Sequence, residues 1–309
     1  MNRLNQFGLG TRLNVYIMAC LAVVFLIISV FIGITTSKTS EENSLKYASE
    51  VTRSIALDLD KTITEHNAMA KTLASILNSN VISSRPAVVK MLVDLYSKSD
   101  WIVATYAGYE PDGFDGNDRA WRGKPVHNPA GQFLPFVHTH PKYGMIHDAS
   151  KIIVDSLLNI ETYDFYQGPK KTNAPYITPP WIYLDPNTNV LQKIVCLTAP
   201  LQWPNGSFRG MAGVNINTGA LLDKFNSLKV FPNGLVFIIH SDGLLLTFPD
   251  QKLTFEKKLV DIKDRFGNAD IERLVSDIAG NRSGFIQGRH PVTKDATWLV
   301  YAPGPTTQW

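Results

Sequence analysis

The chain has 309 residues, of which 44% are apolar and 18% charged, with a formal net charge of +3 at pH 7. This composition excludes a disordered chain, and a net charge this small gives no reason to expect a nucleic acid or another polyanion as partner. The two cysteines, Cys20 and Cys196, fall in a predicted membrane segment and a predicted external strand, so they cannot pair with each other.

The first predicted element is a membrane helix. The segment from Val15 to Ile34 contains no charge, and Ser29 is its one clearly polar side chain. A helix of this length can cross ~30 Å of hydrocarbon. A cleaved signal peptide is the weaker alternative, because the apolar run exceeds the usual core of about 7–15 residues and no small-residue cleavage site follows.

The charges before this helix predict its orientation. Arg3 and Arg12 precede the span with no acidic residue nearby, and positive charge favours the cytoplasmic side. We therefore expect residues 1–14 in the cytoplasm and residues 15–37 across the inner membrane. The chain after about residue 38 would then be periplasmic.

Residues 38–80 form the next predicted element, a long amphipathic helix. Apolar side chains recur there at three- and four-residue steps, among them Leu45, Leu59, Ile63, Leu73 and Leu77. A helix of about forty residues is about 60 Å long, far longer than a typical globular helix. We expect it to act as a spine and as the seam of a homodimer, with membrane lipid around the preceding segment.

Short strands and helices follow. The patterns predict helices over residues 86–100, 218–228 and 270–278. Predicted strands cover residues 101–109, 133–138, 176–183, 190–200, 208–215, 235–240, 244–247, 284–288 and 298–301. The fold class is therefore α+β, with two antiparallel sheets on one helical spine. The boundary near Phe231 and Pro232 divides the chain into modules of residues 81–230 and 231–309.

Several segments in this order resemble a known family. They are Phe165 to Thr172 (FYQGPKKT), Pro175 to Tyr183 (PYITPPWIY), Phe208 to Ile216 (FRGMAGVNI) and the Asp242-Gly243 turn. Their order and spacing are similar to those of double Cache sensor domains in bacterial methyl-accepting chemotaxis proteins. The resemblance covers most of residues 39–309.

The resemblance implies two PAS-like modules, with residues 81–230 distal to the membrane and holding a small ligand, and residues 231–309 proximal to it. It also implies a homodimer, a second membrane helix beyond Trp309 and a cytoplasmic signalling half. Histidine kinases and diguanylate cyclases use the same kind of sensor, so both remain alternatives to a chemoreceptor. No enzymatic activity and no cofactor are implied for this region.

The positions that match the family's ligand contacts are Tyr163, Phe165, Tyr166, Trp181, Tyr183 and Asn215. Amino-acid sensors of the family pair the ligand carboxylate with an arginine at the position of Tyr163, and they place acids at the positions of Tyr183 and Asn215 to receive the ammonium. Here the arginine and both acids are absent, so we expect common α-amino acids to be rejected.

The remaining set is aromatic, with one amide. Aromatic faces attract ammonium groups by about 0.5–2 kcal/mol, which makes an amine or quaternary amine one hypothesis. A primary amine would lack a buried carboxylate partner, although Asp164 or Asp185 could supply a charge from nearby. Neutral, amino-acid-like and organic-acid ligands therefore stay open.

Two rival functions are less well supported. A metal-dependent hydrolase would use some of His127, His138, His140, His147 and Asp148, since two imidazoles in H-x-H share one face of a strand and can reach one zinc ion. No H-E-x-x-H motif accompanies them, and solvated loop histidines are the simpler interpretation. A purely structural ectodomain is the other rival, and it predicts no saturable ligand binding.

Overall fold

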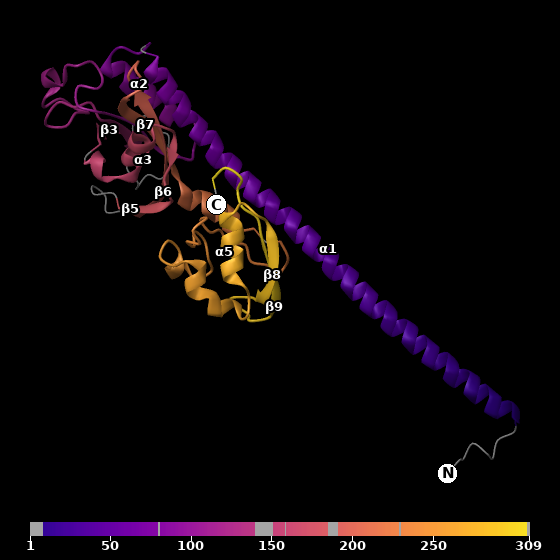
Figure 1. The fold of residues 1–309 in the computed structure, drawn as a ribbon. Coiled ribbons are helices and arrows are strands. Elements are labelled where there is room, and N and C mark those ends of the chain that lie inside the picture. Colours follow the sequence, from indigo (N-terminus) through magenta and orange to yellow (C-terminus); the bar gives the residue numbers. More distant parts are fainter. Residues whose placement is uncertain are drawn as a thin grey trace. The chain divides into compact units, whose positions relative to one another are not determined.

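The computed structural model describes residues 9–79, 81–139, 151–157, 159–184, 191–228 and 230–307. Figure 1 traces the chain from the indigo N-terminus to the yellow C-terminus. Two compact units divide it, Met1–Val51 and Thr52–Trp309. A single helix, α1 (Leu9–Asn78), runs through the end of the first unit and the start of the second. The two helical segments expected over residues 15–37 and 38–80 are thus continuous.

The N-terminal unit consists of the first part of α1. From Leu13 to Ile34 its described apolar side chains are exposed, and Phe25 and Phe31 keep 73% and 70% of their surface. The most apolar 18-residue window of this helix has a mean hydropathy of 2.5 and is 0% buried. A helix with these properties is long and apolar enough to cross a membrane.

The second unit is built on a seven-stranded sheet in the order β3-β2-β1-β7-β6-β4, with β5 also paired to β6. All of its described pairings are antiparallel. The strands are β1 (Ile102–Tyr109), β2 (Pro135–Thr139), β3 (Ile152–Ser156), β4 (Tyr176–Ile177), β5 (Trp181–Leu184), β6 (Leu191–Gln202) and β7 (Phe208–Asn217). The two longest, β6 and β7, form a hairpin whose turn contains Gly206 at φ +81°, a conformation that glycine adopts without steric cost.

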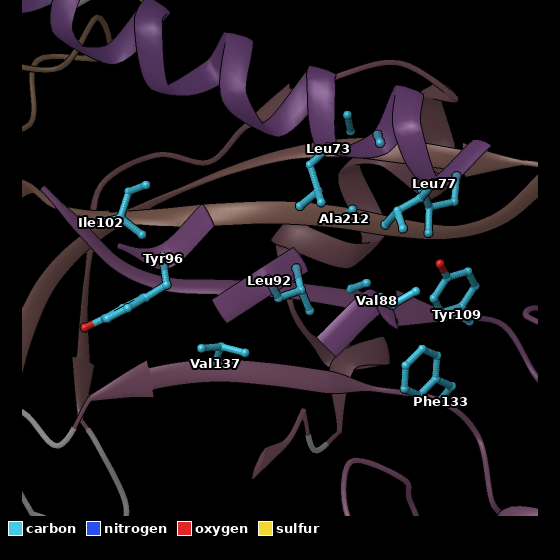
Figure 2. Close-up of a cluster of buried hydrophobic side chains, with 14 residues drawn as sticks. Leu73, Leu77, Val88, Leu92, Tyr96, Ile102, Tyr109, Phe133, Val137 and Ala212 are labelled. Carbon is cyan, nitrogen blue, oxygen red and sulfur yellow. The ribbon is translucent and has the colours of Figure 1, made fainter. Parts of the chain in front are cut away.

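One face of this large sheet packs against α1 and against α2 (Arg85–Tyr96), which Ser84 caps at its N-terminus. Figure 2 shows Leu73 and Leu77 of α1 over Ala212 of β7, and α2 residues beside Val137 of β2. Because β-strand side chains alternate between faces, only every second residue of β1, β6 and β7 belongs to this core. Because one face of α1 is buried here, its apolar residues recur at helical spacing, and this pattern predicted the spine helix from the sequence.

The opposite face carries helix α3 (Asp164–Thr172), preceded by a 3-10 turn at Ile160–Thr162. Its core includes Tyr106 of β1, Cys196 of β6, Met211 of β7 and Phe165 of α3. The large sheet is therefore covered on both faces, by α1 and α2 on one and by α3 with its neighbours on the other.

The chain then passes through α4 (Thr218–Asn226) to a C-terminal region, residues 230–307. That region contains α5 (Ile271–Ala279), a two-stranded sheet of β8 (Gly284–Arg289) and β9 (Ala296–Tyr301), and 3-10 helices at Gln251–Leu253 and Leu259–Phe266. A separate core around Phe248 and Phe266 holds it together. A further 3-10 helix, Asp118–Trp121, lies between β1 and β2.

The structure departs from the predicted elements in four places. The strand expected over 176–183 is two strands, because Pro179 and Pro180 lack the N–H groups that a ladder needs. The strands expected over 235–240 and 244–247 are joined by an isolated bridge between Ile239 and Leu245 rather than a ladder. Helix α3 was not predicted, since Gly168 and Pro169 within it oppose helix formation. Strand β3 was also missed.

Candidate functional site

The residues predicted to bind a ligand come together from three elements. Trp181 and Tyr183 lie on β5, Asn215 lies on β7, and Phe165 and Tyr166 lie on α3. Tyr163 precedes α3 as its N-cap residue. The α3 face of the large sheet thus carries all six positions.

Four of these aromatic residues form a continuous row of ring contacts, in which each ring contacts the next. Tyr163 stacks on Phe165 with ring centroids 5.4 Å apart, and it lies 6.1 Å from Trp181. Trp181 in turn meets Tyr183 edge-on at 5.7 Å. Tyr163 is 37% exposed and Trp181 and Tyr183 are partly buried, so the outer part of this aromatic cluster is accessible.

Tyr166 belongs to a different part of the same face. Its ring packs edge-on against Phe208 at 5.7 Å, and its hydroxyl donates to the carboxylate of Glu110. Lys170 also bonds Glu110, at 2.6 Å. The Tyr166 side chain is 1% exposed and fixes α3 on the sheet through these contacts.

The structure adds Tyr106 of β1 to the predicted set. Its ring meets Phe165 edge-on at 5.6 Å and Phe136 at 6.3 Å. Its hydroxyl donates a hydrogen bond of 2.9 Å to Oδ1 of Asn215. An alternating strand pattern identifies Tyr106 as inward-facing, but no local signal links it to a residue so distant in the sequence.

Beneath the rings lies the thiol of Cys196, which is fully buried. It forms side-chain hydrogen bonds with Trp181, Tyr106 and Thr178, yet burial is the larger effect and raises its pKa to about 12. Burial likewise raises the pKa of Tyr106 well above its ordinary value. Both groups therefore keep their protons at neutral pH.

The buried residues of this cluster are all uncharged. The described acids around it are not buried: Glu110, which is bonded to Tyr166 and Lys170, is 28% exposed, and Asp164 in the first turn of α3 and Asp155 on β3 are exposed. Asp185, proposed as a source of charge, lies outside the described residues. The described cluster thus offers rings, hydroxyls and an amide, and no buried charge.

Comparisons with known proteins bear on this arrangement. No family model and no curated protein matches the chain. Among solved structures, the extracellular domain of mmHK1S-Z2, assigned as a histidine kinase, is similar with a TM-score of 0.73 at 25% identity, over 86% of this chain and 94% of that one. The periplasmic sensory domain of the Campylobacter jejuni chemoreceptor Tlp1 is similar with a TM-score of 0.62 at 14% identity, over 87% and 97%.

A third similar structure is the ligand-binding domain of the Pseudomonas fluorescens chemoreceptor CtaA in complex with L-leucine. Its TM-score is 0.54 at 16% identity, over 87% of this chain and 91% of that chain. This chain has the fold of an extracellular sensor domain. The likeness to Cache-type sensors and the α+β fold class expected from the sequence are confirmed.

The solved structures that are similar to this chain are sensory and ligand-binding domains rather than enzymes. Together with the apolar N-terminal helix, they support a membrane protein with an external domain. The histidines do not gather in the described part of the sensor domain, where no three metal-binding side chains meet. His127 stacks on Trp121 at 5.0 Å, His138 lies 4.7 Å from Phe136, and His140, His147 and Asp148 lie outside the described residues.

A second polar centre in the sensor domain surrounds Arg85 at the start of α2. Its guanidinium bonds both carboxylate oxygens of Asp115 at 3.1 and 2.6 Å, Asp118 at 2.7 Å and the carbonyl of Gly131 at 3.0 Å. The Arg85 side chain is 1% exposed and lies over the rings of Phe114, Trp121 and Phe133. Asp115, Asp118 and Gly131 all belong to the loop between β1 and β2. We therefore interpret Arg85 as the anchor of this loop.

Proposed function

We propose that the chain is the sensory part of a transmembrane receptor, held by its N-terminal helix in the inner membrane and binding a small molecule in the periplasm. The observation that carries this proposal is the sensor-domain fold over 86% of the chain, joined to a membrane-length helix. A chemoreceptor is the first candidate. A histidine kinase is the alternative, supported by the likeness to mmHK1S-Z2, and a diguanylate cyclase remains a second alternative.

We place the ligand at the aromatic cluster on the α3 face of the large sheet, with Tyr163, Phe165, Trp181, Tyr183 and Asn215 as contacts. The partial exposure of Trp181 and Tyr183 supports this, because ligand contacts must be reachable. Tyr166 was also predicted as a contact, and its bond to Glu110 supports a role in holding α3 instead. The membrane-distal module is residues 81–230 in this proposal and the proximal one residues 231–309.

The ligand's chemistry follows from the side chains. CtaA binds L-leucine, but Tyr163 stands where amino-acid sensors have an arginine, so this chain should reject common α-amino acids. Rings without a buried carboxylate can bind a quaternary amine through cation–π attraction of about 0.5–2 kcal/mol. Organic acids and neutral molecules are the other candidate classes.

Signalling would follow from differential binding. A ligand that stabilises one packing of the α3 face shifts the protein toward that packing. Because the opposite face of the same sheet packs on α1, the shift can move the spine helix or its seam in a homodimer relative to the membrane. A second membrane helix beyond Trp309 would complete the route to a cytoplasmic output module.

The test uses the full chain in lipid nanodiscs and a library of amines, quaternary amines, organic acids, purines and amino acids. A ligand that binds the folded protein raises its apparent melting temperature. Replacing the indole in Trp181→Ala should weaken binding of a hit by about tenfold or more, with the unliganded melting temperature within a few degrees of wild type. Trp203→Ala, which removes an exposed tryptophan outside the cluster, is the control.

Two results would count against the proposal. Equal affinity of Trp181→Ala and wild type would remove Trp181 from the site. The absence of any hit with a well-folded protein would favour a structural ectodomain or a sensor that reads a separate binding protein.

A further inference from the structure

Asn215 is the one amide among the candidate contacts, and its surroundings fix its direction. Its side chain is partly exposed on β7. The carbonyl oxygen Oδ1 accepts the hydroxyl proton of Tyr106 at 2.9 Å, and no described residue is recorded as a partner of Nδ2. An amide has two donor hydrogens on nitrogen and acceptor capacity on oxygen, so here the donors are the part left available.

The Tyr106 hydroxyl has one proton, and its neighbours decide where it goes. Its two side-chain partners are Cys196 and Asn215. The thiol sulfur is a weak acceptor, and it is already bonded by Trp181, whose indole N–H can only donate. The amide oxygen is the stronger acceptor, so the proton goes to Asn215.

Tyr106 is also unable to change this role. The side chain is 1% exposed, packed between Phe165 and Phe136, and burial raises the pKa of its hydroxyl well above the ordinary value. It therefore remains a proton donor across the physiological pH range. A buried donor with a fixed partner orients that partner at little further entropic cost.

We propose that Tyr106 is a positioning residue that turns the Asn215 amide so that its N–H donors meet the ligand, and that the ligand presents a carbonyl or carboxylate oxygen at this point. The proposal rests on the proposed function and deepens it. A primary ammonium group is itself a donor only, so it would face the amide donors without a hydrogen bond. The resemblance implies an acid for ammonium at this position, and here the polarity is the reverse.

The test compares matched molecules on the full chain in nanodiscs by titration calorimetry. One set is phenylacetate, phenylacetamide and phenethylamine, and the other is isovalerate, isovaleramide and isoamylamine. Within at least one set the acid or the amide should bind wild type about tenfold or more tightly than the amine, the ratio that one hydrogen bond supplies. The acid and amide arms distinguish an anionic from a neutral acceptor.

Two variants test the roles of the residues. Asn215→Asp keeps an acceptor for Tyr106 but removes the donors, so it should reverse the preference toward the amine. Tyr106→Phe should reduce the discrimination to about threefold or less, because the amide is then free to turn. The control is Tyr109→Phe, which removes a hydroxyl on the other face of β1 for which the described residues provide no partner, and it should leave the discrimination unchanged.

The outcomes separate this inference from the function beneath it. Tighter binding of the amines, or binding of neither set while another library compound binds, overturns the inference and leaves the sensor function intact. Loss of discrimination in Tyr109→Phe to the same extent as in Tyr106→Phe would also overturn it. Binding of no compound at all counts against the proposed function itself.

Discussion

The large sheet and the C-terminal region bury different kinds of side chain. Around the large sheet, the buried polar residues include Arg85, Asp118, His127, His138 and Arg209, with several threonines. In the described residues 230–307, the buried polar side chains are the hydroxyls of Thr247, Thr254 and Thr307. Burying charged and imidazole groups is costly unless they have hydrogen-bond or ionic partners. The interior of the large-sheet half therefore depends on polar interactions as well as on apolar packing.

The C-terminal region shows what packing alone achieves. Its core of Phe248, Phe266, Leu259, Leu274 and Ile286 is apolar. Its ion pairs are exposed, as between Lys263 and Glu272, or only partly buried, as at Asp277, which is 16% exposed. The two regions therefore differ in how their interiors are held together: the Arg85 cluster anchors a loop of the large-sheet half by charge, and the C-terminal core is apolar.

The largest expected loss of stability follows from removing Arg85, the buried cation of the large-sheet half. Arg85→Ala leaves the Asp118 carboxylate, which is 9% exposed, without its cation, and breaking a buried pair in this way costs about 3 kcal/mol or more. Urea unfolding followed by circular dichroism measures the loss. Lys90→Ala breaks an exposed pair with Asp94 on the same helix and should change the stability little. Equal losses of stability in Arg85→Ala and Lys90→Ala would contradict the difference expected between a buried and an exposed ion pair.

The ion pair between Arg85 and Asp115 also predicts that the protein loses stability at low pH. The hydrogen bond from Arg85 lowers the pKa of Asp115 below its ordinary value. A carboxyl with a lowered folded-state pKa contributes stability above its unfolded pKa of about 3.9 and loses it as the pH falls toward the folded value. Unfolding measured between pH 6 and pH 2 should show this loss in wild type and much less of it in Asp115→Asn.

A smaller effect is expected where the C-terminal segment meets the spine helix. Oδ1 of Asp60 on α1 accepts from the backbone N–H groups of Thr306 at 2.9 Å and Thr307 at 2.7 Å, and Asp60 is 6% exposed. Asp60→Ala should destabilise the protein by about 2 kcal/mol, the range for hydrogen bonds to charged groups. Hydrogen exchange should rise at these two amides, whereas Asp58→Ala, at an exposed pair with Lys224, should leave them protected.

Phe266→Leu tests whether the C-terminal core is independent of the ligand site. Phe266 is fully buried against Phe237 and Phe248, so the smaller side chain should cost about 1.5 kcal/mol. Ligand affinity measured by calorimetry should stay at the wild-type value. A matching loss of affinity would show that the site reaches into this region.

The smallest effect concerns Asp242 in the turn of the C-terminal region. Burial opposes its ionisation, but hydrogen bonds from His240 and Lys258 outweigh this and lower its pKa to about 2. Its contribution is present above the unfolded pKa of about 3.9 and disappears as the pH falls toward 2. Because the carboxylate is 46% exposed, solvent screening keeps the contribution below about 1 kcal/mol. Asp242→Asn should flatten this part of the pH profile.

Much of the architecture follows from local patterns in the sequence. The apolar run from Val15 to Ile34, the three- and four-residue steps of the spine and the alternation in β1, β6 and β7 each reflect what one segment buries. Periodicity is a property of a single element, so it identified the membrane helix, the spine and the main strands. The aromatic positions of the candidate site came instead from the resemblance of Phe165 to Thr172 and Pro175 to Tyr183 to double Cache sensor domains.

What the sequence could not determine are the relations between segments. Leu235 to His240 has a strand-like pattern, yet it forms one isolated bridge, between Ile239 and Leu245, because a strand requires a neighbour in register. Tyr106 and Asn215 are 109 positions apart, and only the antiparallel pairing of β1 with β7 brings the hydroxyl to the amide. Side-chain hydrogen bonds between distant strands depend on the tertiary fold, so the direction of the Asn215 amide was decided there.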